Sequence, residues 1–164
     1  MWAPVPTASP ALLAVDLGVR TGLAFYGRDG RLLSYRSQNA GSRARLKRAA
    51  AAILADTPSL ERLVLEGGGD LAEVWKKAGG RRGLAVNVVD AETWRRALLL
   101  ARHRRNGADA KAAADGLARA VIGWSGAPAP KGPLRHDAAE AIGAGLWGVL
   151  RAGWLDALPD AIRA

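Results

Sequence analysis

Residues 14–22, with the sequence AVDLGVRTG, decide how this chain folds. They overlap the apolar run 11–17 (ALLAVDL), which predicts a central strand buried on both of its faces. Gly18 and Gly22 let the backbone turn tightly after the strand, so a metal ion or a phosphate has room beside the carboxylate of Asp16. The stretch therefore predicts a buried strand that ends in an acidic site, with a capped turn as the structural alternative.

Outward from this stretch, short apolar runs alternate with helical patterns. Arg28-Asp29-Gly30-Arg31 predicts a hairpin turn, and Gly79-Gly80 is expected to end a helix. The expected strands are 11–17, 21–26, 32–36, 62–66 and 84–89, and the expected helices are 42–55, 71–77, 90–101, 108–122 and 134–150. This order predicts an α/β fold: a mixed five-stranded sheet, made of a three-stranded antiparallel meander plus parallel strands, flanked by helices.

The length of 164 residues fits one domain, which we place at 11–152 between a flexible N-terminal lead-in (1–10) and a C-terminal tail (153–164). The absence of cysteine excludes disulfides and thiolate metal sites. No apolar stretch approaches the roughly 18 residues that span a membrane, and the first ten residues lack the features of a signal peptide. We therefore expect a soluble, cytoplasmic protein without membrane association.

Four acidic residues in three separated places carry the functional argument. Asp16 and Glu66 each close an apolar run, and Asp137 and Glu140 lie three residues apart on one face of a predicted helix. Taken singly, each has a structural explanation as a turn cap, an edge-strand charge or a solvated helix face. Carboxylates at strand ends are stable when a positive charge shares the site, so together they favour a divalent metal ion beside a phosphate backbone. The chemistry they predict is that of a nuclease.

The charge of the chain supports a nucleic-acid partner. Its 24 Lys and Arg residues outnumber 15 Asp and Glu residues, for a net charge of +9. Between residues 76 and 105, nine basic residues face only Asp90 and Glu92, a local net charge of +7. Such clusters bind phosphates without reading the base sequence. The expected DNA-binding residues are Lys76, Lys77, Arg81, Arg82, Arg95, Arg96, Arg102, Arg104, Arg105 and, further on, Lys111.

Three segments, AVDLGVRTG, LVLEGGG and HDAAEAIGAG, together resemble the motifs of the RuvC family of Holliday junction resolvases, within the RNase H-like superfamily. The stretch TWRRALLLARHRRNGADAKAAAD is a weaker match, and the resemblance covers roughly residues 11–150. It implies an RNase H-like fold and a homodimer that acts on branched DNA, the four-way junction, in recombination and repair. The implied activity is that of a crossover junction endodeoxyribonuclease with two Mg²⁺ or Mn²⁺ ions per active site, which leaves 5′-phosphate and 3′-hydroxyl ends.

The same resemblance assigns roles within the site. Asp16 would bridge both metal ions, Glu66 would hold one, and Asp137 with Glu140 would hold the other. His136 precedes Asp137 directly and would assist the metal or the leaving oxygen, or only cap the helix. The chain departs from the family twice: Glu140 stands where aspartate is usual, and glycines follow Glu66 in place of a segment with glutamine and an aromatic residue.

Other interpretations of the sequence remain open. A YqgF-type relative would act on RNA, and a non-catalytic DNA-structure-binding protein would keep the basic cluster while its acids were dispensable. An actin-like ATPase needs two such domains, for which 164 residues leave no room. Among the tryptophans, Trp75 is expected to stack on an unpaired base, whereas Trp147 and Trp154 are expected in the core or in a subunit interface.

Overall fold

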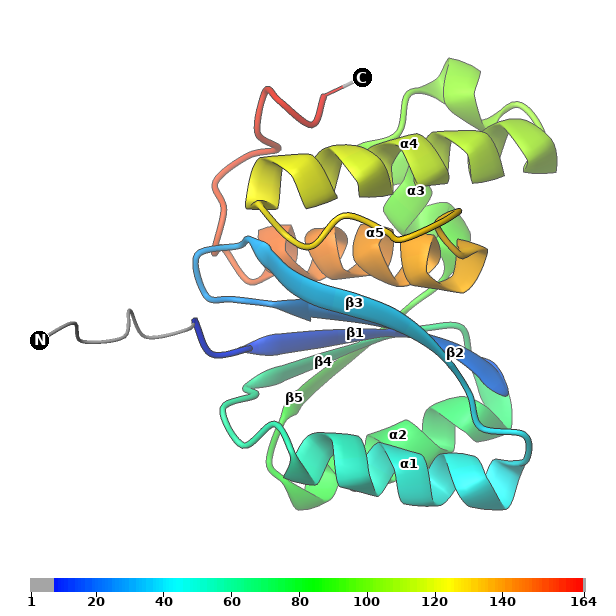
Figure 1. Cartoon of the computed structure of the whole chain (residues 1–164), viewed down its shortest axis with the longest axis vertical. Helices are drawn as coiled ribbons and strands as arrows, with labels where there is room; N and C mark the ends of the chain where they lie inside the picture. Colours follow the sequence, from blue (N-terminus) through cyan, green and yellow to red (C-terminus); the bar gives the residue numbers. More distant parts are fainter. Residues whose placement is uncertain (1–7, 164) are drawn as a thin grey trace, which may run out of the picture.

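Five strands form one mixed sheet in the computed structural model, which describes residues 8–163 (Figure 1). The strand order is β3-β2-β1-β4-β5, in which β2 pairs antiparallel with both β1 and β3, and β4 pairs parallel with both β1 and β5. The strands are β1 (Leu12–Asp16), β2 (Arg20–Tyr26), β3 (Leu32–Asn39), β4 (Arg62–Glu66) and β5 (Ala85–Val89). This sheet confirms the predicted meander joined to parallel strands.

Helices cover both faces of the sheet (Figure 1). One layer holds α1 (Arg43–Ala55) and α2 (Gly69–Arg81). The other holds α3 (Ala91–Leu98), the short 3-10 helix η1 (Ala101–Arg104), α4 (Gly107–Ser125) and α5 (His136–Arg151). In this second layer α5 lies directly on the sheet and α4 lies outside it (Figure 1). The described helices include none that is long and apolar enough to cross a bilayer.

Alternating side chains of the strands pack into two separate hydrophobic cores, one on each face of the sheet. On β1, Leu12 and Ala14 face the α5 side, whereas Leu13 and Val15 face α1 and α2, and all four are fully buried. This confirms the prediction of a strand buried on both faces. Ile162, in the segment that the sequence suggested as a tail, is buried in the α5-side core. Of the expected lead-in, residues 1–7 lie outside the described part of the chain.

Small residues allow α5 to lie unusually close to the sheet. A Cβ atom at Gly145 would stand 2.3 Å from the ring of Tyr26, and one at Gly148 would stand 2.5 Å from Val64. On the sheet side, a Cβ at Gly22 would stand 1.9 Å from the carbonyl oxygen of Asp137. Since Gly22 is the register partner of Asp16, this contact brings the first turn of α5 against the end of β1.

Three expectations need correction. The helix α2 does not stop before Gly79-Gly80 but continues to Arg81. Gly79 lies inside the helix because its lack of a side chain leaves room for the contact with Leu63 and Val86. The helix α3 ends at Leu98 rather than near residue 101, and the short helix η1 follows it. The stacking prediction for Trp75 is wrong because this side chain is fully buried between the sheet and α2.

Candidate active site

Two of the four acids meet because their strands are parallel neighbours. Asp16 ends β1 and Glu66 ends β4, and the two residues are register partners. Both side chains point to the α5 side, since they continue the alternation of Ala14 and Val64. The chain then turns sharply through Gly67, whose φ of +118° is the reason for a glycine directly after Glu66.

The other two acids approach from the first turns of α5. Asp137 and Glu140 are only 9% and 3% exposed. Ser37 of β3 donates a hydrogen bond of 2.6 Å to Oδ2 of Asp137, and the Ala138 amide donates one of 3.0 Å to Oδ1. The Asp137 carboxylate is therefore held on both oxygens where α5 meets the sheet.

The neighbouring acids contribute to the raised pKa values of Asp16 and Glu66, so these carboxylates lie within electrostatic reach of one another. Burial raises the pKa of Asp16 to about 7, with further contributions from the charges of Glu140 and Asp137. Burial, together with Glu140 and Asp16, likewise raises the pKa of Glu66 far above its usual range. The Arg95 guanidinium lowers both pKa values. The Trp94 indole also lowers the pKa of Glu66, although its N–H lies outside hydrogen-bond geometry. Without a further cation, Asp16 and Glu66 therefore keep their protons to a higher pH than ordinary carboxylic acids do.

Two basic side chains contact Glu140. Arg95 of α3 forms an ion pair with Oε1 of Glu140 through Nη2, and its side chain is 19% exposed. Nε2 of His136 lies 3.4 Å from the same oxygen. The sequence placed Arg95 among the DNA-binding residues and missed this contact, because 45 residues separate the two partners and no local pattern joins them.

The donor set fits a hard divalent cation. Asp16 lies within electrostatic reach of the other three carboxylates, and the buried atoms Oε2 of Glu66 and Oε2 of Glu140 have no hydrogen-bond partner. Oxygen ligands of this kind suit Mg²⁺ and Mn²⁺. Within residues 8–163, however, no three acidic or histidine side chains are already arranged as a metal-binding cluster. Glu140 is engaged by Arg95 instead.

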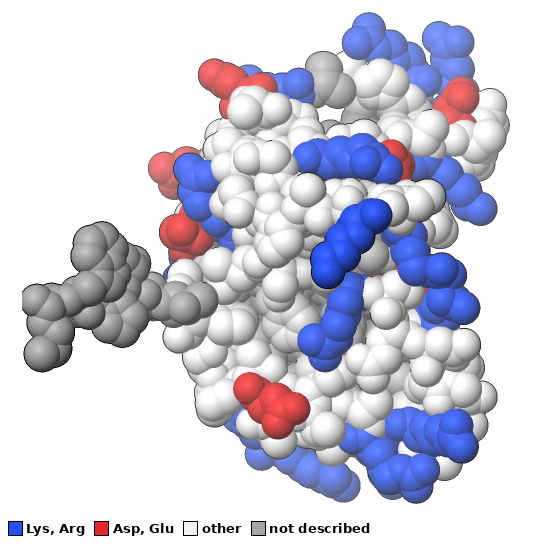
Figure 2. Space-filling model, in the orientation of Figure 1, with Lys and Arg blue, Asp and Glu red and all other residues white. Residues whose placement is uncertain are grey.

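The structure divides the predicted DNA-binding residues between two sides of the sheet. Arg95 and Arg104 line a pocket of about 510 Å³ with Asn106 and Gly107 at the start of α4. On the α5 side lie Arg95, Arg96, Arg102, Arg104, Arg105 and Lys111, whereas Lys76, Lys77, Arg81 and Arg82 lie on or directly after α2. Figure 2 shows basic side chains both on the right, where α5 begins, and along the lower edge, where α1 and α2 lie.

Arg82 has a structural task within the second group. Its guanidinium donates to the carbonyl oxygen of Leu54, near the C-terminal end of α1, and to those of Thr57 and Pro58 at 3.4 and 3.2 Å. These bonds add a side-chain donor to carbonyl oxygens at the end of α1 and in the turn that follows it. Arg82 thereby joins the end of α2 to the end of α1.

The sheet order, the two strand-end acids and the helix that crosses them define an RNase H-like α/β fold. Among solved structures the chain resembles Thermus thermophilus RuvC. It matches RuvC in complex with a Holliday junction substrate with a TM-score of 0.60 and 17% identity over 87% of this chain and 94% of that one. A second Thermus thermophilus RuvC structure gives 0.55 and 18% over 85% and 94%. No protein-family model and no curated protein matches the sequence.

Proposed function

We propose that this protein is a metal-dependent, structure-selective endonuclease that resolves Holliday junctions by paired phosphodiester cuts. The observation that carries the proposal is the electrostatic coupling of Asp16 to Glu66, Asp137 and Glu140, the last three of which are buried. The RuvC-like fold supports it, since one of the matched structures is a RuvC bound to a Holliday junction substrate. The expected products carry 5′-phosphate and 3′-hydroxyl ends.

Each side chain of the site has its own proposed role. Two Mg²⁺ or Mn²⁺ ions, when bound, would supply an activated water and charge stabilisation for the leaving 3′-oxygen. Asp16 and Glu66 present their carboxylates from the sheet, and Asp137 and Glu140 present theirs from α5. Ser37 orients Asp137. His136, half-exposed with its Nε2 3.4 Å from Oε1 of Glu140, would assist the metal or the leaving oxygen.

The partner in this proposal is branched DNA, and the acting form is a homodimer. Resolution of a four-way junction needs two cuts, and a two-fold symmetric dimer supplies two equivalent sites. Arg96, Arg102, Arg104, Arg105 and Lys111 lie on the same side of the sheet as α5, where they would bind phosphates near the cut.

The test uses a synthetic four-way junction with Mg²⁺ or Mn²⁺, and compares wild type with Asp16→Asn. We expect symmetrical cleavage by wild type, none by the variant, and junction binding by both. Asp160→Asn is the matched control, because Asp160 is 97% exposed and should be dispensable. Cleavage by Asp16→Asn at the wild-type rate would refute the assigned site. An RNA substrate cut in preference to the junction would favour a YqgF-type activity instead.

One observation favours a second candidate, a non-catalytic DNA-structure-binding protein. Arg95 already neutralises Glu140, and a guanidinium in this place would serve a protein that needs no metal. Such a protein would bind the junction with the same affinity in EDTA and in Mg²⁺, and it would cleave it in neither. A gain in thermal stability on addition of Mn²⁺ to wild type, absent in Asp16→Asn, would exclude this candidate.

A further inference from the structure

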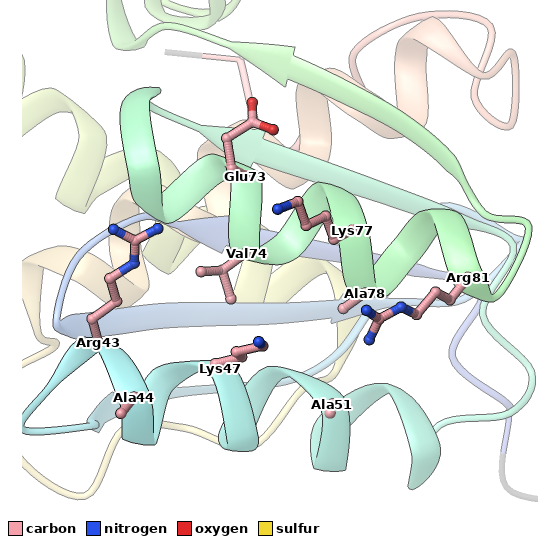
Figure 3. Close-up of a pocket in the computed structure, with 9 residues that line it drawn as sticks. All are labelled: Arg43, Ala44, Lys47, Ala51, Glu73, Val74, Lys77, Ala78 and Arg81. Atoms are coloured by element: carbon pink, nitrogen blue, oxygen red, sulfur yellow. The ribbon is translucent and has the colours of Figure 1, made fainter.

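A basic groove runs between α1 and α2, on the face of the sheet opposite the candidate active site (Figure 3). Its volume is about 560 Å³. Its floor consists of small apolar side chains, and four cations flank it in two rows: Arg43 and Lys47 on α1, and Lys77 and Arg81 on α2. The sequence predicts one DNA-binding group that joins Lys77 and Arg81 to the basic residues of α3 and η1, and it indicates no role for Arg43 or Lys47.

The positive charge of the groove is poorly compensated by the chain itself. Glu73 is the acid that lines it, and this residue forms an ion pair of 3.1 Å with Lys76. Arg43 pairs with Asp70 at 3.1 Å, outside the groove lining. Among the described residues, Lys47, Lys77 and Arg81 have no ion-pair partner. Like charges four residues apart on a helix repel weakly, and an anion bound between the two rows would relieve that repulsion.

The spacing of these cations suits a repeating anion. Within each row they are one helical turn apart, roughly 6 Å along the axis, and both rows run the same way along the groove (Figure 3). The floor residues Ala44, Ala51, Val74 and Ala78 offer no side-chain donors or acceptors that could read bases. No aromatic side chain lines the groove, whereas Trp and Tyr are enriched among the residues that dominate the binding energy of protein interfaces. These features favour a sugar–phosphate backbone over a folded protein.

The position of the groove connects it with the acids. The helix α2 begins three residues after Glu66, and α1 begins four residues after the end of β3. Both helices therefore start at the sheet end that carries the candidate site and lead away from it. We infer that the α1–α2 groove binds the phosphodiester backbone of a nucleic-acid arm beyond the one being cut. The inference rests on the proposed function, because it assumes that nucleic acid is the substrate.

The test is the salt dependence of binding to a four-way junction in EDTA, where no cleavage interferes. Wild type is compared with the triple variant Lys47→Gln, Lys77→Gln and Arg81→Gln, whose three side chains are all exposed. The slope of log K against log salt is negative, and each lost phosphate contact reduces its magnitude by about 0.9. We therefore expect the magnitude of the slope to decrease by about 2–3 for this variant. The double variant Lys47→Arg and Lys77→Arg, which keeps Arg81, should have the wild-type slope.

The matched control removes the same charge elsewhere, through Arg28→Gln, Arg151→Gln and Arg163→Gln. Arg28 precedes the Asp29-Gly30 turn between β2 and β3, Arg151 ends α5, and Arg163 is close to the C-terminus. A slope change below about 1 in this control is expected.

An equal change in both triple variants would overturn the inference, and so would an unchanged slope in the groove variant. Loss of dimerisation in the groove variant, measured by sedimentation, would overturn it too, by making the groove a protein interface. Failure of the proposed function is distinguishable, because it would show as junction binding by wild type without cleavage in Mg²⁺.

Discussion

At the scale of single residues, the pKa of Asp16 reflects how far its carboxyl is buried and how much negative charge surrounds it. Its ordinary pKa of 3.8 rises to about 7 in the folded protein because of burial and then the neighbouring acids. Between these two values the folded state keeps a proton that the unfolded state has released. The resulting contribution to stability is therefore complete below about pH 4 and is lost as the pH rises to about 7.

This shift predicts a pH-dependent stability that a metal reverses. In EDTA, the unfolding midpoint of wild type should fall as the pH rises from 4.5 to 7, and Asp16→Asn should fall less over that range. Glu66, whose pKa is also raised, should extend the fall of both proteins above pH 7. Added Mn²⁺ should stabilise wild type most at high pH, because its ligands must lose their protons first. Thermal melts measure all three effects, and parallel curves for the two proteins in EDTA would contradict the assignment.

Arg95 leads to a second prediction at this scale. Arg95→Ala leaves the buried Glu140 carboxylate without its guanidinium, and loss of one partner from a buried ion pair typically lowers stability by about 3–5 kcal/mol. We expect a decrease of that order in EDTA and a much smaller one in Mn²⁺, measured by denaturant unfolding. Arg96→Ala is the control, because its pair with Glu92 is exposed and contributes less than about 1 kcal/mol. An equal loss with and without metal would show that Arg95 has a purely structural role.

At the scale of secondary-structure elements, the contact between α5 and the sheet positions two of the four acids. The Tyr26 hydroxyl donates a hydrogen bond of 2.5 Å to the carbonyl oxygen of Ile142, and Gly145 leaves room for the Tyr26 ring. Since α5 is rigid, a displacement here moves Asp137 and Glu140 together. The integrity of the site therefore depends on glycines in the middle of a helix, where glycine is intrinsically unfavourable.

Gly145→Ala tests this dependence. Its new methyl group would stand 2.3 Å from the Tyr26 ring and 3.0 Å from the Cβ of Ala14, so overpacking should destabilise the protein by about 1–3 kcal/mol. Gly116→Ala on α4 is the matched control, because no atom lies within 4 Å of the added methyl group. That variant should be neutral, or more stable by about 0.4–1 kcal/mol. Chemical denaturation measures both, and two equally stabilised variants would refute close packing at Gly145.

The same element shows what the sequence could and could not predict. Strand and helix order followed from apolar periodicity, and the helix expected from residue 42 is capped by Ser42, whose side chain accepts from the Arg45 amide at 3.3 Å. The end of α2 was mispredicted because Gly79 is kept for its contact with the sheet, which local propensity does not contain. The four acids could be found because each follows a recognisable strand or opens a helix. Their partners Ser37 and Arg95 could not, since only the fold brings them close.

At the scale of the whole molecule, the sheet separates two basic surfaces that are mixed in the sequence. The run from Lys76 to Arg105 looks like one cluster, but β5 lies in its middle and carries the chain from α2 on one face to α3 on the other. Lys77 and Arg81 consequently join Arg43 and Lys47, whereas Arg95 joins the acids. A branched substrate with several arms is the kind of polyanion that could contact both surfaces at once.

The proposed homodimer leads to a prediction about the whole assembly. If each protomer makes one of two paired cuts, then a dimer of one wild-type and one Asp16→Asn protomer should cut a single strand. Wild type mixed with a tenfold excess of Asp16→Asn, allowed to exchange subunits, should therefore convert a supercoiled cruciform plasmid mainly into nicked circles. Wild type alone should give mainly linear plasmid, because its second cut follows before the complex dissociates.

Asp160→Asn added in the same excess should leave linear plasmid as the main product, since its protomers retain all four acids. Linear plasmid as the main product with Asp16→Asn would mean that one protomer makes both cuts, and it would remove the need for a dimer.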